Sequence, residues 1–194
     1  GYAAGKAVRT ASHNGRPDAF HTRIICAAAR KGDGMKLLVF SDSHGETEPM
    51  RLAMRRERPD AVLHLGDHAA DAFALAQEYY ATSVAYVRGN CDFSFPPCAE
   101  TYRRTLEGVT IFACHGHRYG VKSSLLALSY AAREQGAALA LFGHTHCPYL
   151  ETSEGLTLLN PGACGGRRPT YAVVELRGGS AVCRIKDVYS EEYQ

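Results

Sequence analysis

Five short apolar runs in this sequence each end at a glycine that stands beside Asp, His or Asn, and this repeated pattern constrains the fold most. The first run, residues 37–40, is continuous, contains Val and Phe, and predicts a strand buried on both faces. The polar residues that follow the five runs are, in order, Asp42 and His44; Asp67; Asn90 and Asp92; His115 and His117; His144 and His146. One such strand end is a weak indication, but five in order need a common cause.

Strands and helices alternate in the first half of the chain. Further strands are expected at 61–65 and 83–87. A helix that Thr47 caps and Pro59 ends lies between the first strand and 61–65, and a second helix over 69–80 lies between 61–65 and 83–87. The apolar side of this second helix is expected to carry Phe73, Ala76 and Tyr80. This order predicts a parallel sheet, and ligands of such sheets bind at the carboxyl ends of the strands. The polar strand ends should therefore face one site.

The second half of the sequence predicts mostly β-structure. Residues 102–106 and 109–114 suggest a hairpin, followed by a helix over 122–135 and a buried strand over 138–142. Short β segments are then expected at 149–152, 157–159, 171–176 and 181–186.

Length and charge favour one folded domain with an extension. The chain has 194 residues, and two compact domains would be cramped within it. Residues 1–34 hold six basic and two acidic residues, net +4, which leaves residues 35–194 at −2 of the chain's +2. We expect 1–34 to be a non-native or disordered N-terminal extension, with a transit peptide as a further alternative, and 35–194 to form the domain. The basic balance therefore does not argue for nucleic-acid binding.

Cysteine usage and hydropathy indicate a cytoplasmic protein. The seven cysteines are odd in number and contain no Cys-x-x-Cys, which favours a reducing compartment over a disulfide framework. No apolar run is long enough to cross a bilayer, so no membrane partner is expected.

The polar strand ends offer carboxylate, imidazole and amide ligands. This mixture suits divalent Mn, Fe, Zn, Ni, Co or Mg. About seven ligands exceed the needs of one tetrahedral site, and two ions about 3.5–4 Å apart would account for them. Asp67 is the natural bridge, because a carboxylate has two oxygens to share. The isolated His64 and His68 are expected to be ordinary hydrogen-bonded histidines.

The series Asp-x-His, Gly-Asp, Gly-Asn-Cys-Asp, His-Gly-His and Gly-His-Thr-His resembles the calcineurin-like metallophosphoesterases, and more narrowly their small YfcE-type phosphodiesterase subfamily. The resemblance covers residue 35 to about residue 186. It implies an α/β fold, a four-layer α/β/β/α sandwich of two mixed sheets flanked by helices. It also implies two metal sites that share one carboxylate. One would use Asp42, His44, Asp67 and His146, and the other Asp67, Asn90, His115 and His144.

The resemblance is incomplete at the position after Asn90. The larger family commonly has a histidine there that assists the leaving group, and this chain has Cys91. Cys91 and His117 are therefore both candidate catalytic residues, and His117 could instead orient a ligand. Asn90 and Arg167 are the candidate substrate contacts, although a solvated loop is the favoured interpretation of Arg167.

The resemblance implies a phosphoric diester hydrolase in which a hydroxide bridging two divalent ions, Mn²⁺ foremost, attacks a small phosphodiester. The alternatives are a non-catalytic scaffold of the same fold, like the retromer subunit Vps29, and a phosphomonoesterase or nucleotidase. Long nucleic acid is an unlikely partner by charge, since residues 35–194 are slightly acidic and the chain lacks Trp. A homodimer or homotetramer is expected by analogy.

Overall fold

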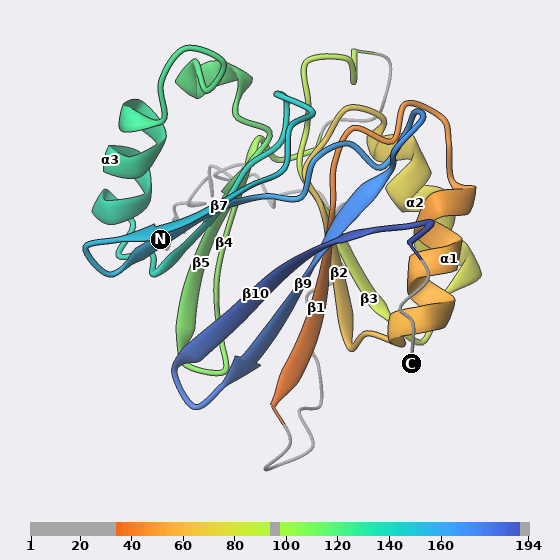
Figure 1. Cartoon of the computed structure of the whole chain (residues 1–194), viewed down its shortest axis with the longest axis horizontal. Helices are drawn as coiled ribbons and strands as arrows, with labels where there is room; N and C mark the ends of the chain where they lie inside the picture. Colours follow the sequence, from red (N-terminus) through yellow and green to blue (C-terminus); the bar gives the residue numbers. More distant parts are fainter. Residues whose placement is uncertain (1–33, 94–97, 191–194) are drawn as a thin grey trace, which may run out of the picture.

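The computed structural model describes residues 34–93 and 98–190, which build two five-stranded mixed sheets packed face to face (Figure 1). The first half of the chain supplies β1 (Met35–Phe40), α1 (Glu48–Glu57), β2 (Ala61–His64), α2 (Ala69–Glu78) and β3 (Ser83–Tyr86). The middle supplies β4 (Thr101–Leu106), β5 (Val109–Cys114), a 3₁₀ turn (His117–Tyr119), α3 (Leu126–Glu134) and β6 (Leu139–Leu141). The remainder is β7 (Tyr149–Ser153), β8 (Leu156–Asn160), β9 (Thr170–Arg177) and β10 (Ser180–Asp187).

The first sheet has the order β10-β9-β1-β2-β3. Strands β1, β2 and β3 are parallel, with Leu37 opposite Ala61 and Ala61 opposite Ser83. Strand β9 returns antiparallel beside β1 and continues into the β10 hairpin. The parallel β-α-β-α-β unit expected from the sequence is confirmed, and the carboxyl ends of β1, β2 and β3 lie at one edge.

The second sheet has the order β4-β5-β6-β8-β7. Strands β5, β6 and β8 are parallel, and β4 and β7 flank them antiparallel. The expected β4–β5 hairpin is confirmed, with Leu106 paired to Val109. The carboxyl ends of β5 and β6 carry the remaining polar strand ends.

The apolar alternation along each strand divides the core into three layers. In β1, Leu37 and Val39 lie between the sheets, whereas Leu38 and Phe40 lie under α1 and α2. The outer face of the second sheet is buried against α3, where Leu128 is fully buried. Each fully buried side chain of this kind contributes about 1.5–3 kcal/mol. Figure 1 shows α1 and α2 on one side of the strands and α3 on the other, so the expected four-layer α/β/β/α sandwich is confirmed.

Three local expectations were wrong. Phe73 in α2 is 46% exposed, and Tyr80, which lies beyond the end of the helix at Glu78, is 77% exposed, because the helix packs Ala72 and Leu75 against the sheet. Helix α3 begins at Leu126 rather than at residue 122, since a 3₁₀ turn and a following loop occupy the preceding stretch. Thr47 stands at the N-cap of α1 without capping it, because its hydroxyl accepts a hydrogen bond from the Arg51 side chain.

The expectation for residues 1–34 lies outside the described residues except for Gly34. Within the described ranges, no helix has the length and apolar character needed to cross a membrane.

Candidate metal centre

Asp42 follows β1 and has one oxygen held by hydrogen bonds and one left over. Its Oδ2 accepts hydrogen bonds from the Ser41 hydroxyl at 2.5 Å and from the His144 amide at 3.1 Å. Its Oδ1 is buried and has no hydrogen-bond donor among the described residues. A buried anionic oxygen without a partner is costly, so this atom calls for a cation.

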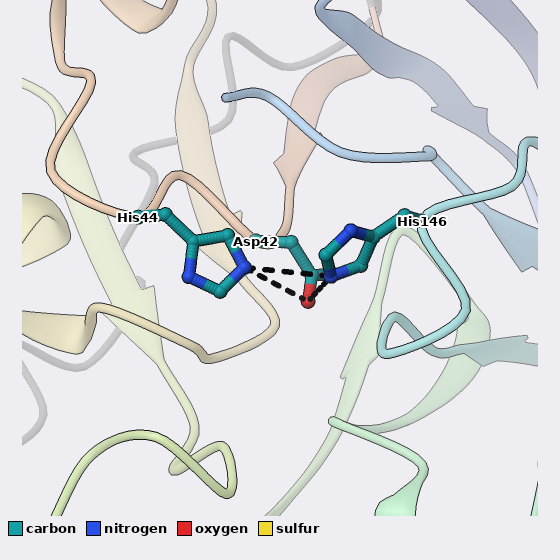
Figure 2. Close-up of side chains that lie close together, drawn as sticks. All are labelled: Asp42, His44 and His146. Atoms are coloured by element: carbon teal, nitrogen blue, oxygen red, sulfur yellow. Dashed lines mark hydrogen bonds and ion pairs between the residues drawn. The ribbon is translucent and has the colours of Figure 1, made fainter. Parts of the chain in front are cut away.

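Two histidines converge on that oxygen (Figure 2). The Nε2 atoms of His146 and His44 lie 3.1 Å and 4.0 Å from Asp42 Oδ1, and 3.4 Å from each other. His44 comes from the loop after β1 and His146 from the loop after β6, so both sheets contribute. Ligands bound at about 2.0–2.2 Å to one ion have comparable spacings, and two imidazoles with a carboxylate suit a divalent metal.

A second group forms beside the first from Asp67, His115 and His144, whose ligand atoms all lie within 4.8 Å of one another. His115 Nε2 lies 3.4 Å from Asp67 Oδ2 and 3.1 Å from Asn90 Oδ1. Its other nitrogen, Nδ1, donates to the Leu65 carbonyl at 2.8 Å, which fixes the ring and directs Nε2 into the site.

Asp67 lies between the two groups. Besides its place with His115 and His144, it forms a third set with His44 and Cys91 within the same 4.8 Å. Its Oδ1 accepts the Cys91 amide at 2.8 Å, while its Oδ2 faces His115. A carboxylate shared by two ions would have to stand in such a position.

The loops that carry these ligands are held in an unusual backbone conformation. Five of the seven predicted ligands have φ between 48° and 68°, the left-handed region, which costs a non-glycine residue about 1–3 kcal/mol. These residues are Asp42, His44, Asp67, His144 and His146. The surrounding structure must therefore impose these conformations.

Asp92 is one support. Its buried carboxylate accepts four backbone N–H groups, those of Asp67, His68, Ala69 and Gly89, at 2.8–3.1 Å. It thereby holds the Asp67 turn and the first N–H groups of α2. From sequence, Asp92 was grouped with the potential ligands, but the amides already occupy both of its oxygens.

Asp71 supports the turn that contains His44. Its Oδ2 accepts the Ser43 hydroxyl at 2.7 Å and the Gly45 amide at 2.8 Å. The fully buried His64 lies 3.1 Å from the same hydroxyl through Nε2 and accepts the Gly66 amide at 3.2 Å through Nδ1. His64 is thus a hydrogen-bonded core histidine, as expected.

Asn160 supports the loop of His144 and His146. Its Nδ2 donates to the Gly143 carbonyl and the Thr145 hydroxyl, each at 3.0 Å, while Oδ1 accepts the Gly162 amide at 2.9 Å. A Cβ on Gly143 would stand 1.9 Å from the Ser41 hydroxyl, so only glycine lets the two loops approach this closely.

The comparisons with known proteins agree with this geometry. A family model described as the calcineurin-like phosphoesterase superfamily domain matches residues 35–179. This chain belongs to the calcineurin-like phosphoesterase superfamily. Members of this superfamily bind divalent metals, and the unpartnered Asp42 oxygen and surrounding imidazoles fit such an ion.

Relatives within the superfamily cover most of the chain. The chain is 34% identical over 166 residues to the Bacillus subtilis probable metallophosphoesterase YsnB, covering 82% of this chain and 95% of the relative. It is 29% identical over 168 residues to the Escherichia coli phosphodiesterase YfcE, covering 73% and 88%.

Solved structures share the fold. A Streptococcus pneumoniae protein described as a predicted phosphoesterase is similar with a TM-score of 0.67 and 27% identity, over 82% of this chain and 92% of that one. Vps29 from Entamoeba histolytica, as a single mutant, is similar with a TM-score of 0.64 and 22% identity, over 79% and 99%, which shows the fold alone.

The electrostatics of this phosphoesterase site demand positive charge at its centre. Burial would raise the pKa of Asp67, but contacts with His115 and the Cys91 amide outweigh it and hold that pKa well below its usual range. Burial would lower the pKa of His115, but Asp67 and Asp42 outweigh it and leave that pKa raised.

The candidate catalytic residues stand beside the ligand groups. The His117 ring centroid lies 5.4 Å from that of His115 and 6.1 Å from that of His144, and its buried Nδ1 has no hydrogen-bond partner among the described residues. Cys91 receives a hydrogen bond from Asn90 Nδ2 to Sγ at 3.3 Å. Burial and the Asp67 carboxylate raise the pKa of the Cys91 thiol to about 11, which disfavours the thiolate.

Arg167 is exposed in the loop between β8 and β9, and no hydrogen bond or ion pair joins it to the predicted ligands within the described ranges. That loop nevertheless lies against the Asp42 turn, because the Gly165 amide donates to the Asp42 carbonyl at 3.1 Å. A role for Arg167 in substrate binding stays a prediction.

Proposed function

We propose that this chain is a metal-dependent phosphodiesterase that hydrolyses small phosphodiesters with two divalent ions, Mn²⁺ foremost. The observation that carries the proposal is the position of Asp67 between two ligand groups. The E. coli relative named phosphodiesterase YfcE supports the reaction class. When bound, the two ions supply an activated hydroxide nucleophile and positive charge that stabilises the phosphoryl transition state.

In this proposal each ligand has a defined task. Asp42 Oδ1, His44 and His146 hold one ion, and His115, His144 and Asn90 hold the other. Asp67 is shared by both. Asn90 and Arg167 bind substrate oxygens. Hydrogen bonds to Asp92, Asp71 and Asn160 keep the ligands in place before substrate binds. This preorganisation lowers the activation barrier of the reaction.

His117 is the candidate donor of a proton or hydrogen bond to the leaving oxygen. Its ring adjoins His115 and His144 without belonging to either ligand group. Its unpartnered Nδ1 is compatible with an interaction that forms only when substrate is bound. Cys91 is a weaker candidate, because a protonated thiol of raised pKa is a poor acid near neutral pH.

Diesters are favoured over monoesters by charge. A diester carries one negative charge, whereas a monoester is dianionic near neutral pH. Residues 35–194 carry a net charge of −2, so they repel the diester less than the monoester.

The rival function, a scaffold of the Vps29 kind, is disfavoured because all seven predicted ligand positions hold residues able to bind metal. The cytoplasmic location and the homo-oligomer stay predictions.

The test is hydrolysis of bis-p-nitrophenyl phosphate and p-nitrophenyl phosphate by chelator-treated protein, with Mn²⁺ added back. We expect metal-dependent cleavage of the diester, weaker or absent cleavage of the monoester, and loss of both in Asp67→Ala. Turnover of the monoester alone would overturn diester specificity. No turnover with any divalent metal would favour the scaffold.

A further inference from the structure

A hollow of about 250 Å³ lies beside the second ligand group. Its lining is Arg88, Gly89, Asn90, Phe93, Glu100, His117 and Arg118. Two of these residues, Asn90 and His117, belong to the proposed reaction centre. A substituent on a phosphorus atom bound at that centre can therefore extend into this hollow.

Phe93 gives the hollow an aromatic surface. Its side chain is 80% exposed, the highest value among the large apolar side chains of the described residues. An exposed ring of this kind offers a face on which a flat aromatic group can stack, and such stacking tolerates any base.

The polar part of the hollow carries both charges. The Arg118 guanidinium is paired with Glu100. The Arg88 guanidinium has no ion pair within the part of the chain that the structure describes, although its backbone N–H donates to the Ala99 carbonyl at 2.9 Å. Arg88 is thus available to a ring oxygen or nitrogen of a ligand, and Glu100 can accept from an amino group.

An aromatic face beside hydrogen-bonding side chains suits a nucleobase better than an alkyl chain, which would have no use for the charged lining. The small volume suits one nucleoside, and the net charge of −2 on residues 35–194 disfavours a polynucleotide.

We propose that this hollow binds the nucleoside group of a nucleotide-type phosphodiester, with Phe93 stacking on the base and Arg88 contacting its polar edge. The proposal rests on the phosphodiesterase function proposed above and names its substrate class.

The test compares two diesters that release the same leaving group, thymidine 5′-(p-nitrophenyl phosphate) and methyl p-nitrophenyl phosphate, with the Mn²⁺-loaded full chain. We expect kcat/KM to favour the nucleoside ester by about ten-fold or more, as base stacking typically contributes. Phe93→Ala should reduce this ratio at least five-fold, mainly through KM, and Phe93→Tyr should keep it. Tyr130→Ala, which removes an exposed aromatic ring on α3, is the control and should leave the ratio unchanged.

The outcomes separate this proposal from the phosphodiesterase function. Turnover of the methyl ester without preference for the nucleoside ester, or a preference that Phe93→Ala leaves intact, would overturn the nucleoside site while the phosphodiesterase stands. If neither ester is cleaved, calorimetric titration with thymidine 5′-monophosphate decides. Binding that Phe93→Ala weakens supports the nucleoside site, and absent or unaltered binding overturns it.

Discussion

The His144 amide donates a hydrogen bond to Asp42 Oδ2 at 3.1 Å across 102 residues of sequence. This bond joins the loop after β1 in one sheet to the loop after β6 in the other. Together with Ser41, it satisfies one oxygen of Asp42 and leaves Oδ1 for the histidines. The bond therefore sets which oxygen would hold a metal ion.

Asp42→Asn should separate metal binding from folding. The amide keeps one acceptor for Ser41 and His144 but removes the buried negative charge. We expect metal affinity to fall at least ten-fold, and the metal-free variant to be more stable than the metal-free wild type by about 1 kcal/mol, because a buried charge without a partner is relieved. Calorimetric Mn²⁺ titration and thermal unfolding with chelator test this. A metal-free variant of lower Tm than wild type would contradict it.

Asp92→Asn should weaken the fold and the site together. If an NH₂ group replaces one carboxylate oxygen, the backbone N–H groups that donated to that oxygen face another donor and lose their acceptor. Each buried N–H left unpaired costs about 1–3 kcal/mol. We expect a loss of about 2–4 kcal/mol in unfolding free energy and weaker Mn²⁺ binding. Asp187→Asn at the end of β10 is the control, since Asp187 accepts both of its backbone amides through Oδ1, which the asparagine carbonyl can replace. An equal loss in both variants would remove the special role of Asp92.

Gly143→Ala should disturb the contact between the two sheets' loops. The added Cβ would stand 1.9 Å from the Ser41 hydroxyl and 2.9 Å from Asp42 Oδ2, so one loop must move. We expect loss of most metal binding and of activity. Gly155→Ala is the control: nothing lies within 4 Å of the added Cβ, and the φ of +77° should cost some stability, but Mn²⁺ binding and activity should be retained. Full Mn²⁺ affinity in Gly143→Ala would show that the loops tolerate separation.

His64 should make the metal-free protein sensitive to mild acid. Burial lowers its pKa to about 4, against 6.5 when unfolded, so the unfolded state binds the extra proton between these values. Unfolding free energy should therefore fall as pH drops from about 6.5 to 4, by up to about 3 kcal/mol. Denaturant unfolding with chelator at several pH values measures the slope. His64→Gln should flatten it, and an unchanged slope would mean that another group is responsible.

His117→Ala should reveal whether His117 assists the leaving group. An ester of p-nitrophenol needs little help, because its leaving oxygen is already a weak base, whereas an alkyl leaving group needs a proton. We expect kcat to fall far more for an alkyl phosphodiester than for bis-p-nitrophenyl phosphate. Equal losses on both, accompanied by weaker Mn²⁺ binding, would instead assign His117 to orienting His115 or His144.

The sequence was most informative where apolar pattern and polar residues are adjacent in the chain. The run over residues 37–40 and the order of strands and helices predicted the parallel unit correctly, because local periodicity and chain direction determine it. The polar strand ends meet at one edge for the same reason. The orientation of α2 was predicted wrongly, because the apolar pattern does not show whether large Phe73 or small Ala72 packs against the sheet.

The supports of the site were not predicted, since each acts across many residues. Asp71 holds a turn 26 residues away, and Asn160 holds Gly143 from 17 residues away. Neither contact leaves a periodic pattern in the sequence. Asp92 is the exception in sequence distance, because it accepts the Gly89 amide only three residues before it.

Each metal-ligand group takes members from both sheets: His146 joins Asp42 and His44, while His115 and His144 join Asp67. Between their strands the two sheets meet through an apolar layer, and at the site edge hydrogen bonds such as those of His144 to Asp42 and of His115 to Leu65 join their loops. A slip of one sheet over the other would break these bonds and separate the ligands without breaking a strand pair. Metal affinity therefore depends on how well the two sheets are aligned. A bound metal ion would in turn stabilise this alignment, because its ligands come from both sheets.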